Sequence, residues 1–509
     1  NGIVFYMNPE KKPIPEDFFV PYNAQEIEPS IIATWQESGL TNPDVCIEKG
    51  YISPDAETFS MVLPPPNVTG TLHTGHAFML IIQDIMTRYA RMQGKRTLWL
   101  PGTDHAAIAT QSKVEKELEK KGMKKRDMSR DKFLGYVEQF AQDSHDTIVG
   151  QIKRMGATVD WSREAFTLDK QRNDAVNTVF KKMYDDGLIY RGYRVVNWDS
   201  KGQTVISDDE IVHEERDSVL YTFKYWADFP IAISTTRPET KIGDVAVAVH
   251  PDDARYAQYV GKTYEGVFCN VPLNIKIIAD ESVEKDFGTG ALGVTPAHSI
   301  TDWEISQRHD LEIKPVINEY AKMTTGDETI IGKKTTEARQ VIIEWLEKEN
   351  LLEKSESVKQ NVATAERTGG IIEPLPKLQW FINVNKAISD RGNRTLKELM
   401  LDAVRKDGIE ILPDRFEKVY FNWIEKLRDW NISRQIWYGH RIPVWYKGDE
   451  IYCDAQPPTG DGWIQDEDTL DTWFSSGMWT FSTLGWPEKT TDFGTYHPTT
   501  VLETGPDIL

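Results

Sequence analysis

The chain has 509 residues, more than one hydrophobic core supports, so we expect about two to four domains. Hydrophobic residues make up 39% of the chain and aromatic residues 11%, which excludes a mainly disordered protein. The 59 basic and 79 acidic residues give a formal net charge of −20. That balance argues against a surface that coats DNA or anionic membranes.

Signals for export or membrane insertion do not stand out in the sequence. No apolar run approaches the roughly 18 residues of a membrane helix, and the opening NGIVFYMNPEKK carries no long apolar stretch. Cys46, Cys269 and Cys453 are far apart and odd in number, so we predict neither disulfides nor a CxxC zinc knuckle. A cytoplasmic location follows. Because the chain starts with Asn1 and stops abruptly in VLETGPDIL, we expect it to be a fragment.

The predicted elements begin with an amphipathic helix over residues 24–40. A buried strand over 59–63 is then halted by three prolines, and a helix follows over about 75–91. A second strand, within residues 96–106, ends near Pro101-Gly102. Strand, glycine-bearing loop, helix and strand in this order indicate a parallel α/β sheet with a right-handed crossover.

The pattern changes twice further along the chain. Helical periodicity dominates from about 108 to 186, whereas residues 218–301 contain short β-like runs separated by turn residues. After Arg367 we expect helices and Trp-rich loops. We therefore predict an α/β domain interrupted by a β-rich domain, with an N-terminal segment and first half over 1–210, the insert over 211–365 and the second half over 366–509.

The densest chemical signal is PPPNVTGTLHTGHA (64–77). His73 and His76 stand three residues apart at a predicted helix start, so both rings can face the same side. Gly75 allows close backbone approach, and a helix N-terminus offers unpaired N–H groups for a polyphosphate. The alternatives are a metal-binding pair or two histidines that cap a loop.

This segment resembles a known signature. LHTGHA is similar to the HIGH motif of class I aminoacyl-tRNA synthetases, and PPPNVTG followed by LPGTDHAAIATQ (100–111) resembles the valyl-tRNA synthetase family within that class. Further segments keep the family's order, namely STTRPET (234–240), GTGALGVTPAHSITDWE (288–304), RTGGIIEPLPKLQWF (367–381), DWNISRQIWYGHRIPVW (429–445), LDTWFSSGMWTFSTLGWP (470–487) and LETGPDIL (502–509). The resemblance implies a Rossmann-like parallel-sheet catalytic domain and an inserted β-rich editing domain.

The same resemblance implies a monomeric, ATP-dependent valine–tRNA ligase that uses Mg²⁺ and binds valine and tRNA(Val). His73, Gly75 and His76 would hold ATP. The amino-acid pocket would comprise Asn67 and Asp104 near the substrate ammonium, apolar walls from Pro65, Trp473 and Ile508, and also Asp507. Two alternatives stay open: Asp104 could cap the helix that follows Thr103, and Trp473 could serve packing alone.

The insert would hydrolyse mischarged Thr-tRNA, since an apolar pocket rejects an added hydroxyl group only weakly. By resemblance, Thr235, Thr236 and Arg237 would position the terminal adenosine, Phe287 and Thr295 would line the pocket, and Asp302 would hold the ammonium. Asp302 could instead cap a helix that starts near Trp303.

Several departures from the family pattern bear on function. Gly293 and Ser299 stand where the resemblance predicts Lys and Asp, so we expect weak editing that Gly293→Lys with Ser299→Asp would partly rescue. NWDSKGQTVISDDE (197–210) lacks cysteines that some relatives use for zinc, so no bound metal is predicted. No KMSKS loop precedes the chain end. The alternatives in function are isoleucine–tRNA ligase, or a free-standing tRNA-editing or RNA-binding module on an inactive ligase scaffold.

Overall fold

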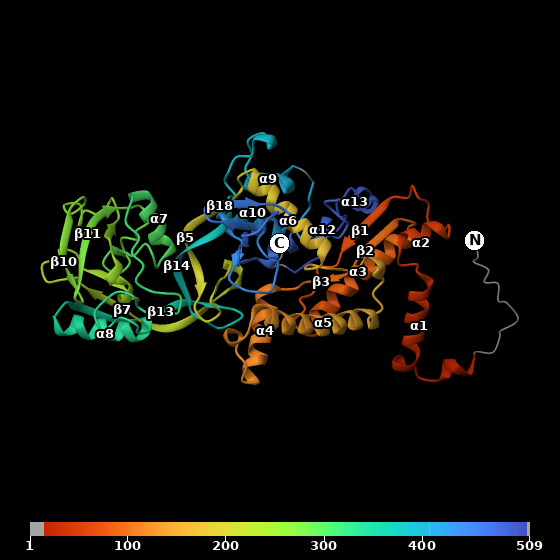
Figure 1. Ribbon diagram of the computed structural model, residues 1–509, viewed down its shortest axis with the longest axis horizontal. Coiled ribbons are helices and arrows are strands. Elements are labelled where there is room, and N and C mark those ends of the chain that lie inside the picture. Colours follow the sequence, from red (N-terminus) through yellow and green to blue (C-terminus); the bar gives the residue numbers. More distant parts are fainter. Residues whose placement is uncertain (1–14, 407, 506–509) are drawn as a thin grey trace, which may run out of the picture. The chain divides into compact units, whose positions relative to one another are not determined.

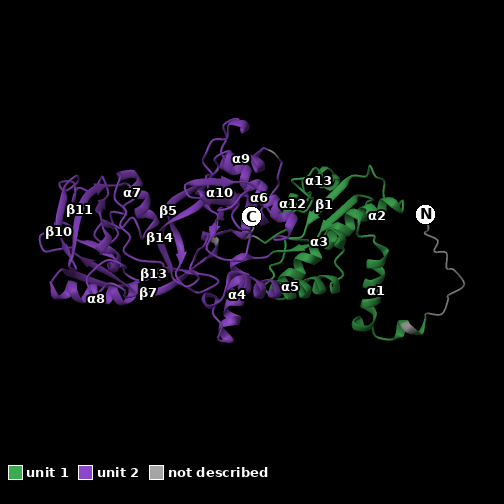
Figure 2. Ribbon diagram, in the orientation of Figure 1, with its two compact units in different colours: residues 1–104, 141–166, 479–505 green, residues 105–140, 167–478, 506–509 purple. Residues whose placement is uncertain are grey.

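The computed structural model describes residues 15–406 and 408–505, and these divide into two compact units (Figure 2). The first unit comprises residues 1–104, 141–166 and 479–505, and the second comprises 105–140, 167–478 and 506–509. The three-domain division made from the sequence stays a prediction.

The first unit is built on the predicted strand–helix–strand. β1 (Thr58–Val62) and β2 (Arg96–Leu100) pair in parallel, and α3 (Thr74–Met92) connects them (Figure 1). The second strand ends at Leu100, just before Pro101-Gly102 as predicted. After Pro101, β3 (Gly102–Thr103) pairs in parallel with β4 (Ala165–Phe166). Met61 also pairs with Val501 in parallel, so a late segment extends the sheet. The predicted α/β architecture is confirmed.

Close packing holds these strands in place. The core of the unit contains buried Met61, Leu63, Leu80 and Trp99. At Gly102, a methyl group would lie 2.4 Å from both the backbone oxygen of Ala165 and the ring of Trp479, so only glycine fits. The Trp479 indole N–H in turn donates to the backbone oxygen of Leu63 (2.9 Å), which ties the late segment to the end of β1.

Helices precede and follow this sheet. The predicted N-terminal helix is confirmed as α1 (Ala24–Ser38), and no residue of it is buried. Trp35 of α1 helps line a cavity of about 400 Å³ together with Thr158 and Trp161. The remaining elements of the unit are η1 (Glu16–Phe19), α2 (Pro43–Glu48), η3 (Trp161–Arg163), α12 (Trp479–Ser482) and α13 (Thr491–Tyr496).

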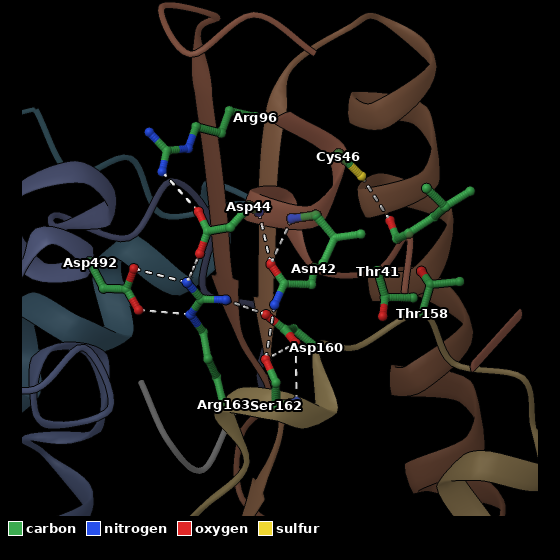
Figure 3. A network of polar contacts seen from close by, with 12 residues as sticks. Thr41, Asn42, Asp44, Cys46, Arg96, Thr158, Asp160, Ser162, Arg163 and Asp492 are labelled. Atoms are coloured by element: carbon green, nitrogen blue, oxygen red, sulfur yellow. Dashed lines mark hydrogen bonds and ion pairs between the residues drawn. The ribbon is translucent and has the colours of Figure 1, made fainter. Parts of the chain in front are cut away.

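A cluster of charges fastens α2, η3 and α13 to one another (Figure 3). The guanidinium of Arg163 bonds to Asp160 (2.6 Å), Asp44 (2.6 Å) and Asp492 (2.7 Å). Burial alone would lower the pKa of Arg163, but the hydrogen bonds with Asp492 and Asp44 raise it above its usual value. Arg163 therefore stays charged and bridges three separate segments.

The second unit contains two long antiparallel ribbons. β5 (Ile189–Asp199) pairs with β14 (Ile372–Ile382) along its whole length, and β7 (Ile211–Phe223) pairs with β13 (Leu352–Ala365), from Ile211 opposite Ala365 to Phe223 opposite Leu352 (Figure 1). The first ribbon extends to a sheet with strand order β15-β14-β5-β6, in which β15 is Trp430–Asn431 and β6 is Thr204–Val205. The second extends to a sheet of order β13-β7-β8, in which β8 is Ile233–Thr235.

Between β7 and β13 the chain forms the predicted β-rich region. A mixed sheet of order β10-β11-β9-β12 surrounds a core that includes Phe223, Phe268 and Ile277. The elements of the whole region between β7 and β13 are β8 (Ile233–Thr235), η5 (Pro238–Gly243), β9 (Ala246–Val249), β10 (Thr263–Phe268), β11 (Val271–Ala279), β12 (Ala291–Val294), α7 (Ile300–His309) and α8 (Thr335–Lys348).

Helices dominate residues 107–185, as predicted, with α4 (Ala107–Lys120), η2 (Lys125–Asp127), α5 (Arg130–Arg154) and α6 (Lys170–Asp185). Short elements complete the unit: β6 (Thr204–Val205), η4 (Asp208–Glu210), η6 (Ser389–Arg391), α9 (Leu396–Arg405), α10 (Arg415–Lys426), β15 (Trp430–Asn431), β16 (Ser433–Arg434), β17 (Val444–Lys447), β18 (Glu450–Cys453), β19 (Ile464–Gln465), β20 (Thr469–Leu470) and α11 (Thr472–Ser476). None of the described helices is both long and apolar enough to cross a membrane.

The sequence prediction for the region after Arg367 was incomplete. Besides helices and loops, the region contains β14 and six short strands. Pro374 and Pro376 make β14 hard to predict from the sequence, because proline lacks the N–H group that a strand donates to its neighbour. Both prolines nevertheless pair with β5, opposite Asn197 and Val195.

The Arg163 cluster predicts a stability change. Replacing Arg163 with Met leaves Asp160 buried without its cation, and breaking such a buried pair costs about 3–5 kcal/mol. Because Asp44 is nearly half exposed, we expect the free energy of unfolding to fall by about 3 kcal/mol, near the low end of that range. Chemical denaturation checks this, with Arg216→Met as control because Arg216 pairs with Glu214 on the surface. Equal effects of the two substitutions would contradict the role of the cluster.

Candidate functional site

The HxGH segment forms the start of α3 in the first unit. His73 is the N-cap residue: its Nδ1 accepts a hydrogen bond from the backbone N–H of Gly75 (3.1 Å). The Nδ1 of His76 accepts from the backbone N–H of His73 (3.3 Å), which completes a capping box. The two rings lie with their centroids 4.0 Å apart. The structure thus brings both histidines together at a helix N-terminus, as predicted.

This capping fixes which ring nitrogen carries a proton. Because each Nδ1 accepts a backbone N–H, each neutral imidazole must carry its hydrogen on Nε2. Burial, and then the neighbouring His73, lower the pKa of His76, which is therefore neutral at pH 7. Both rings accordingly offer an N–H donor from Nε2 beside the positive end of the helix dipole.

Gly75 is needed for this geometry. A methyl group at position 75 would lie 2.9 Å from Cε1 and 3.0 Å from Nδ1 of His73, closer than carbon atoms pack. The glycine therefore leaves space for the ring that caps the helix. The backbone N–H of Leu72 also donates to the side-chain oxygen of Gln151 (2.8 Å), which anchors the loop before the helix.

Two predicted pocket residues lie next to each other at the ends of β1 and β2. Asn67 and Asp104 form a parallel bridge: the N–H of Val68 donates to the Asp104 backbone oxygen (2.9 Å), and the N–H of Asp104 donates to Pro66 (2.9 Å). Asn67 is exposed, Asp104 is buried, and Pro65, in the same loop, is half-buried. Asp104 does not occupy the N-cap of α4, which begins at Ala107 after Ala106, so the capping alternative is wrong.

The remaining pocket residues lie elsewhere in the chain. Trp473 belongs to α11 of the second unit and is 37% exposed, and both its role in the pocket and the packing alternative stay predictions. The backbone N–H of Trp473 donates to the carboxylate of Asp471 (2.9 Å), and Asp471 pairs with the buried guanidinium of Arg434. This pairing fixes the start of α11. Asp507 and Ile508 lie outside the described residues.

A second constellation lies wholly within the second unit, around Thr295 and Asp302. The backbone N–H of Thr295 donates to the Oδ2 atom of Asp302 (2.8 Å), and both residues are buried. Ser299, not Asp302, is the N-cap of α7, because its hydroxyl oxygen accepts from the N–H of Asp302 (3.2 Å). The alternative that Asp302 caps the helix is therefore wrong, and its carboxylate is used outside the helix.

The other predicted residues of this region divide into two groups. Thr235 accepts a hydrogen bond from the N–H of Arg237 (3.0 Å), and the Arg237 guanidinium pairs with Glu373 and with Glu239. These contacts give the Thr235–Thr236–Arg237 turn a fixed shape. Phe287, in contrast, is 61% exposed.

Position 293 does not accept the side chain that the resemblance predicts. A methyl group on Gly293 would lie 2.4 Å from Oδ2 of Asp244 and 2.5 Å from the Tyr225 hydroxyl. A lysine at position 293 would therefore have to displace buried polar groups, which argues against the predicted partial rescue of editing by Gly293→Lys with Ser299→Asp. Ser299→Asp would keep a capping residue, since Asp is a good N-cap.

Sequence reasoning missed the polar residues that fill this space. Lys241, Asp244 and Tyr225 form a buried network around Gly293, and His298 lies nearby. The His298 Nδ1 contacts the backbone oxygen of Pro374 (3.2 Å) and its Nε2 accepts from Val316 N–H (2.8 Å); burial, and then Arg237, lower its pKa to about 3. The sequence signal that could have found this network was the pair Lys241 and Asp244, which comes just after STTRPET (234–240).

Metal ligands are not grouped in the structure. Among residues 15–406 and 408–505 no set of three His, Cys, Asp or Glu side chains could hold a metal ion. The metal-pair alternative for His73 and His76 lacks a third ligand there. The absence of bound zinc remains a prediction.

Comparisons with known proteins match most of the chain. Residues 30–459 and 455–509 match the family model of the class I tRNA synthetases (I, L, M and V). The chain is 42% identical over 499 residues to a valine–tRNA ligase of Clostridium acetobutylicum, which covers 96% of this chain and 55% of that protein. It is 44% identical over 501 residues to the corresponding ligase of Streptomyces coelicolor, which covers 96% of this chain and 54% of that protein. The chain therefore spans about half the length of these relatives.

Two solved structures are also similar. The agnB2 LeuRS of Agrobacterium radiobacter K84, in a ternary complex with tRNA and LeuAMS, has a TM-score of 0.42 at 16% identity and covers 93% of this chain and 63% of its own. A methionyl-tRNA synthetase of Mycobacterium tuberculosis bound by methionyl-adenylate has a TM-score of 0.42 at 11% identity and covers 89% and 52%.

The capping box predicts how His76 titrates. We expect its pKa to lie below 6.5, the ordinary value for histidine. Replacing His73 with Asn keeps a capping residue but removes the second imidazole, so the pKa should rise towards 6.5 without reaching it, because burial remains. NMR titration of the ring carbons measures both values. His145, whose pKa Glu164 raises by a hydrogen bond, is the internal control and should not move.

Proposed function

Because the chain belongs to the class I tRNA synthetases of the isoleucine, leucine, methionine and valine group, we propose that it carries the catalytic and editing regions of a valine–tRNA ligase. The observation that carries the proposal is the HxGH capping box, which presents two imidazole N–H donors at the start of α3. The relatives named valine–tRNA ligase support valine rather than isoleucine as the substrate.

The first reaction step would form valyl-adenylate. The valine carboxylate attacks the α-phosphate of ATP in line, and pyrophosphate leaves. The N–H groups of His73 and His76 would donate to phosphate oxygens, and the α3 N-terminus would favour their negative charge. Mg²⁺ would arrive with the ATP phosphates, since the described residues provide no acidic cage for it.

The amino-acid pocket would begin at the ends of β1 and β2. Asp104, beside Asn67, supplies the negative charge that a substrate ammonium needs. By the family resemblance, Pro65, Trp473, Asp507 and Ile508 would also belong to the pocket. Proline and tryptophan are stiff side chains, which suits exclusion of a larger amino acid by shape.

The second step transfers the valyl group to tRNA(Val). A ribose hydroxyl at the tRNA 3′ end attacks the carbonyl carbon of the adenylate, and AMP leaves. Positioning and charge stabilisation can supply most of the rate, so few protein groups need to react. We propose a monomeric, cytoplasmic enzyme; the free thiols of Cys46, Cys269 and Cys453 are consistent with a reducing compartment.

Editing would take place in the second unit. Asp302, held by the backbone of Thr295, would bind the ammonium of a mischarged threonyl ester. Thr235, Thr236 and Arg237 would hold the terminal adenosine, and Phe287 and Thr295 would line the pocket. The rival function, an editing or RNA-binding module on an inactive ligase, predicts no valine-dependent exchange of pyrophosphate into ATP.

We predict that His76→Ala in the whole enzyme lowers the turnover number of valine-dependent pyrophosphate exchange by about 10²–10³ with little change in valine binding, because a donor directed at developing charge is lost. Steady-state exchange kinetics with valine, isoleucine and threonine test both the role and the substrate. His213→Ala, which removes an exposed histidine, is the control. An unchanged turnover number for His76→Ala would rule out this role.

We also predict that Asp302→Asn slows hydrolysis of pre-charged Thr-tRNA(Val) by about 10- to 100-fold, since hydrogen bonds to a charged group contribute about 1.5–3 kcal/mol. Asparagine keeps an oxygen for the Thr295 N–H, so the fold should persist. A deacylation time course measures the rate. The matched control on the same helix is Glu304→Gln, because Glu304 pairs with Arg428 instead. Equal rates in Asp302→Asn and the unsubstituted enzyme would exclude the carboxylate from the site.

A further inference from the structure

A buried lysine lies beside the proposed editing residues. Lys241, in η5, is 5% exposed. Its ammonium donates to the backbone oxygen of Gly293 (2.7 Å), the hydroxyl of Thr295 (2.8 Å) and the carboxylate of Asp244 (3.3 Å). An ammonium group has three donors, and here all three are used. Lysine is seldom buried, so this arrangement requires a reason.

The hydroxyl of Thr295 has a fixed direction in this network. It accepts from Lys241 and therefore donates its own hydrogen to Asp244. Asp244 also accepts from the hydroxyl of Tyr225. The side chain of Thr295 is thus held from both sides by buried partners, with no freedom to rotate.

The backbone of the same residue holds Asp302. The N–H of Thr295 donates to the Oδ2 atom of Asp302 (2.8 Å), and Asp302 is the proposed anchor for the substrate ammonium. Lys241 therefore bonds to the side chain of Thr295, whereas Asp302 bonds to its backbone N–H. A shift of Thr295 after loss of Lys241 would move the anchor as well.

Charge gives a second reason for the lysine. Asp244 and Asp302 are both buried near Thr295, and Lys241 is the cation bonded to this group. Position 293, where the resemblance predicts a lysine, contributes only its backbone oxygen, and its methyl position is filled by Asp244 and Tyr225. The cation comes from η5 rather than from β12.

We propose that Lys241 is a positioning residue of the editing site: its ammonium fixes Thr295 and thereby places Asp302 to bind the ammonium of a mischarged aminoacyl ester. This inference rests on the proposed editing function. It reverses the expectation that Gly293 weakens editing, since the charge predicted at that position is supplied by another element.

The network should also set a pH dependence. Burial raises the pKa of Asp244 to about 6, and Lys241 opposes this rise. The charged and titratable groups that act on Asp244 are Lys241 from η5, Tyr225 after β7 and Asp302 from α7. Protonation of Asp244 would remove its negative charge and so weaken its hydrogen bond with Thr295 and its ion pair with Lys241. The rate of hydrolysis should therefore decrease as the pH is lowered through about 6. Without Lys241 the pKa of Asp244 rises further, so this decrease should begin at a higher pH.

The experiment uses the whole enzyme and pre-charged Thr-tRNA(Val). We expect Lys241→Met to slow deacylation at least about 10-fold, to shift the acid limb of its pH profile upward and to leave valine-dependent pyrophosphate exchange within about twofold. Thr295→Val combined with Lys241→Met should be no slower than the slower single variant, because both act through one hydroxyl. Lys276→Met removes an exposed lysine of β11 and is the control.

The outcomes separate the inference from the function on which it rests. If hydrolysis depends on Asp302 but is unchanged in Lys241→Met, only the role of Lys241 is overturned. Additive losses with an unshifted pH profile would reduce Lys241 to a structural ion pair and also overturn it. If the unsubstituted enzyme does not hydrolyse Thr-tRNA, the editing function fails and the inference with it. Should Lys241→Met melt below the assay temperature, Lys241→Gln, which keeps a donor but not the charge, gives the same test.

Discussion

The parallel pairing of β1 with β2 determines where the first unit can place functional groups. Both strands end at the same edge of the sheet, and backbone bonds between Val68, Asp104 and Pro66 continue the pairing beyond them. Asn67 and Asp104 are consequently brought together, and α3 starts a few residues later with its capping histidines. Parallel strands require a crossover helix, and the start of such a helix lies at the carboxyl edge of the sheet. The HxGH segment occupies that position.

Buried polar networks have a comparable organising role in the second unit. Arg434 with Asp471 fixes the start of α11, and Arg237 with Glu373 and Glu239 fixes the turn after β8. Such ion pairs add little net stability by comparison with apolar packing, but a partner left alone is costly. Their value lies in permitting only one arrangement of the loops that carry function.

Local signals predicted much of the first unit. The helical period of residues 24–40, the apolar strand before three prolines and the glycines near the histidines each reflect interactions between residues close in sequence. Asn67 and Asp104 were assigned to one pocket through the family resemblance, whereas the approach of His73 and His76 followed from their spacing. Exposure of α1 did not follow, because amphipathicity does not say what covers the apolar side.

Other features depend on contacts distant in sequence and could not be predicted in this way. Lys241 meets Gly293 and Thr295 only because η5 and β12 lie side by side, and 52 and 54 residues separate these partners. Gly293 was interpreted as a missing contact, since a sequence does not show that the methyl position is already filled. The prolines of β14 misled for the opposite reason: a local rule against strands was overridden by long-range pairing with β5.

The ribbon of β7 and β13 has a consequence for how the chain could have acquired its β-rich segment. Ile211 and Ala365, the first and last residues of that segment, are direct partners across the ribbon. Neighbouring strands lie roughly 5 Å apart, a gap that a two-residue turn closes. A chain with residues 1–210 joined directly to 366–509 could therefore gain the 211–365 segment, or lose it, without a change in the distance between the two junctions. Because the two ends of the segment are adjacent, its insertion leaves the spacing of the flanking chain ends unchanged.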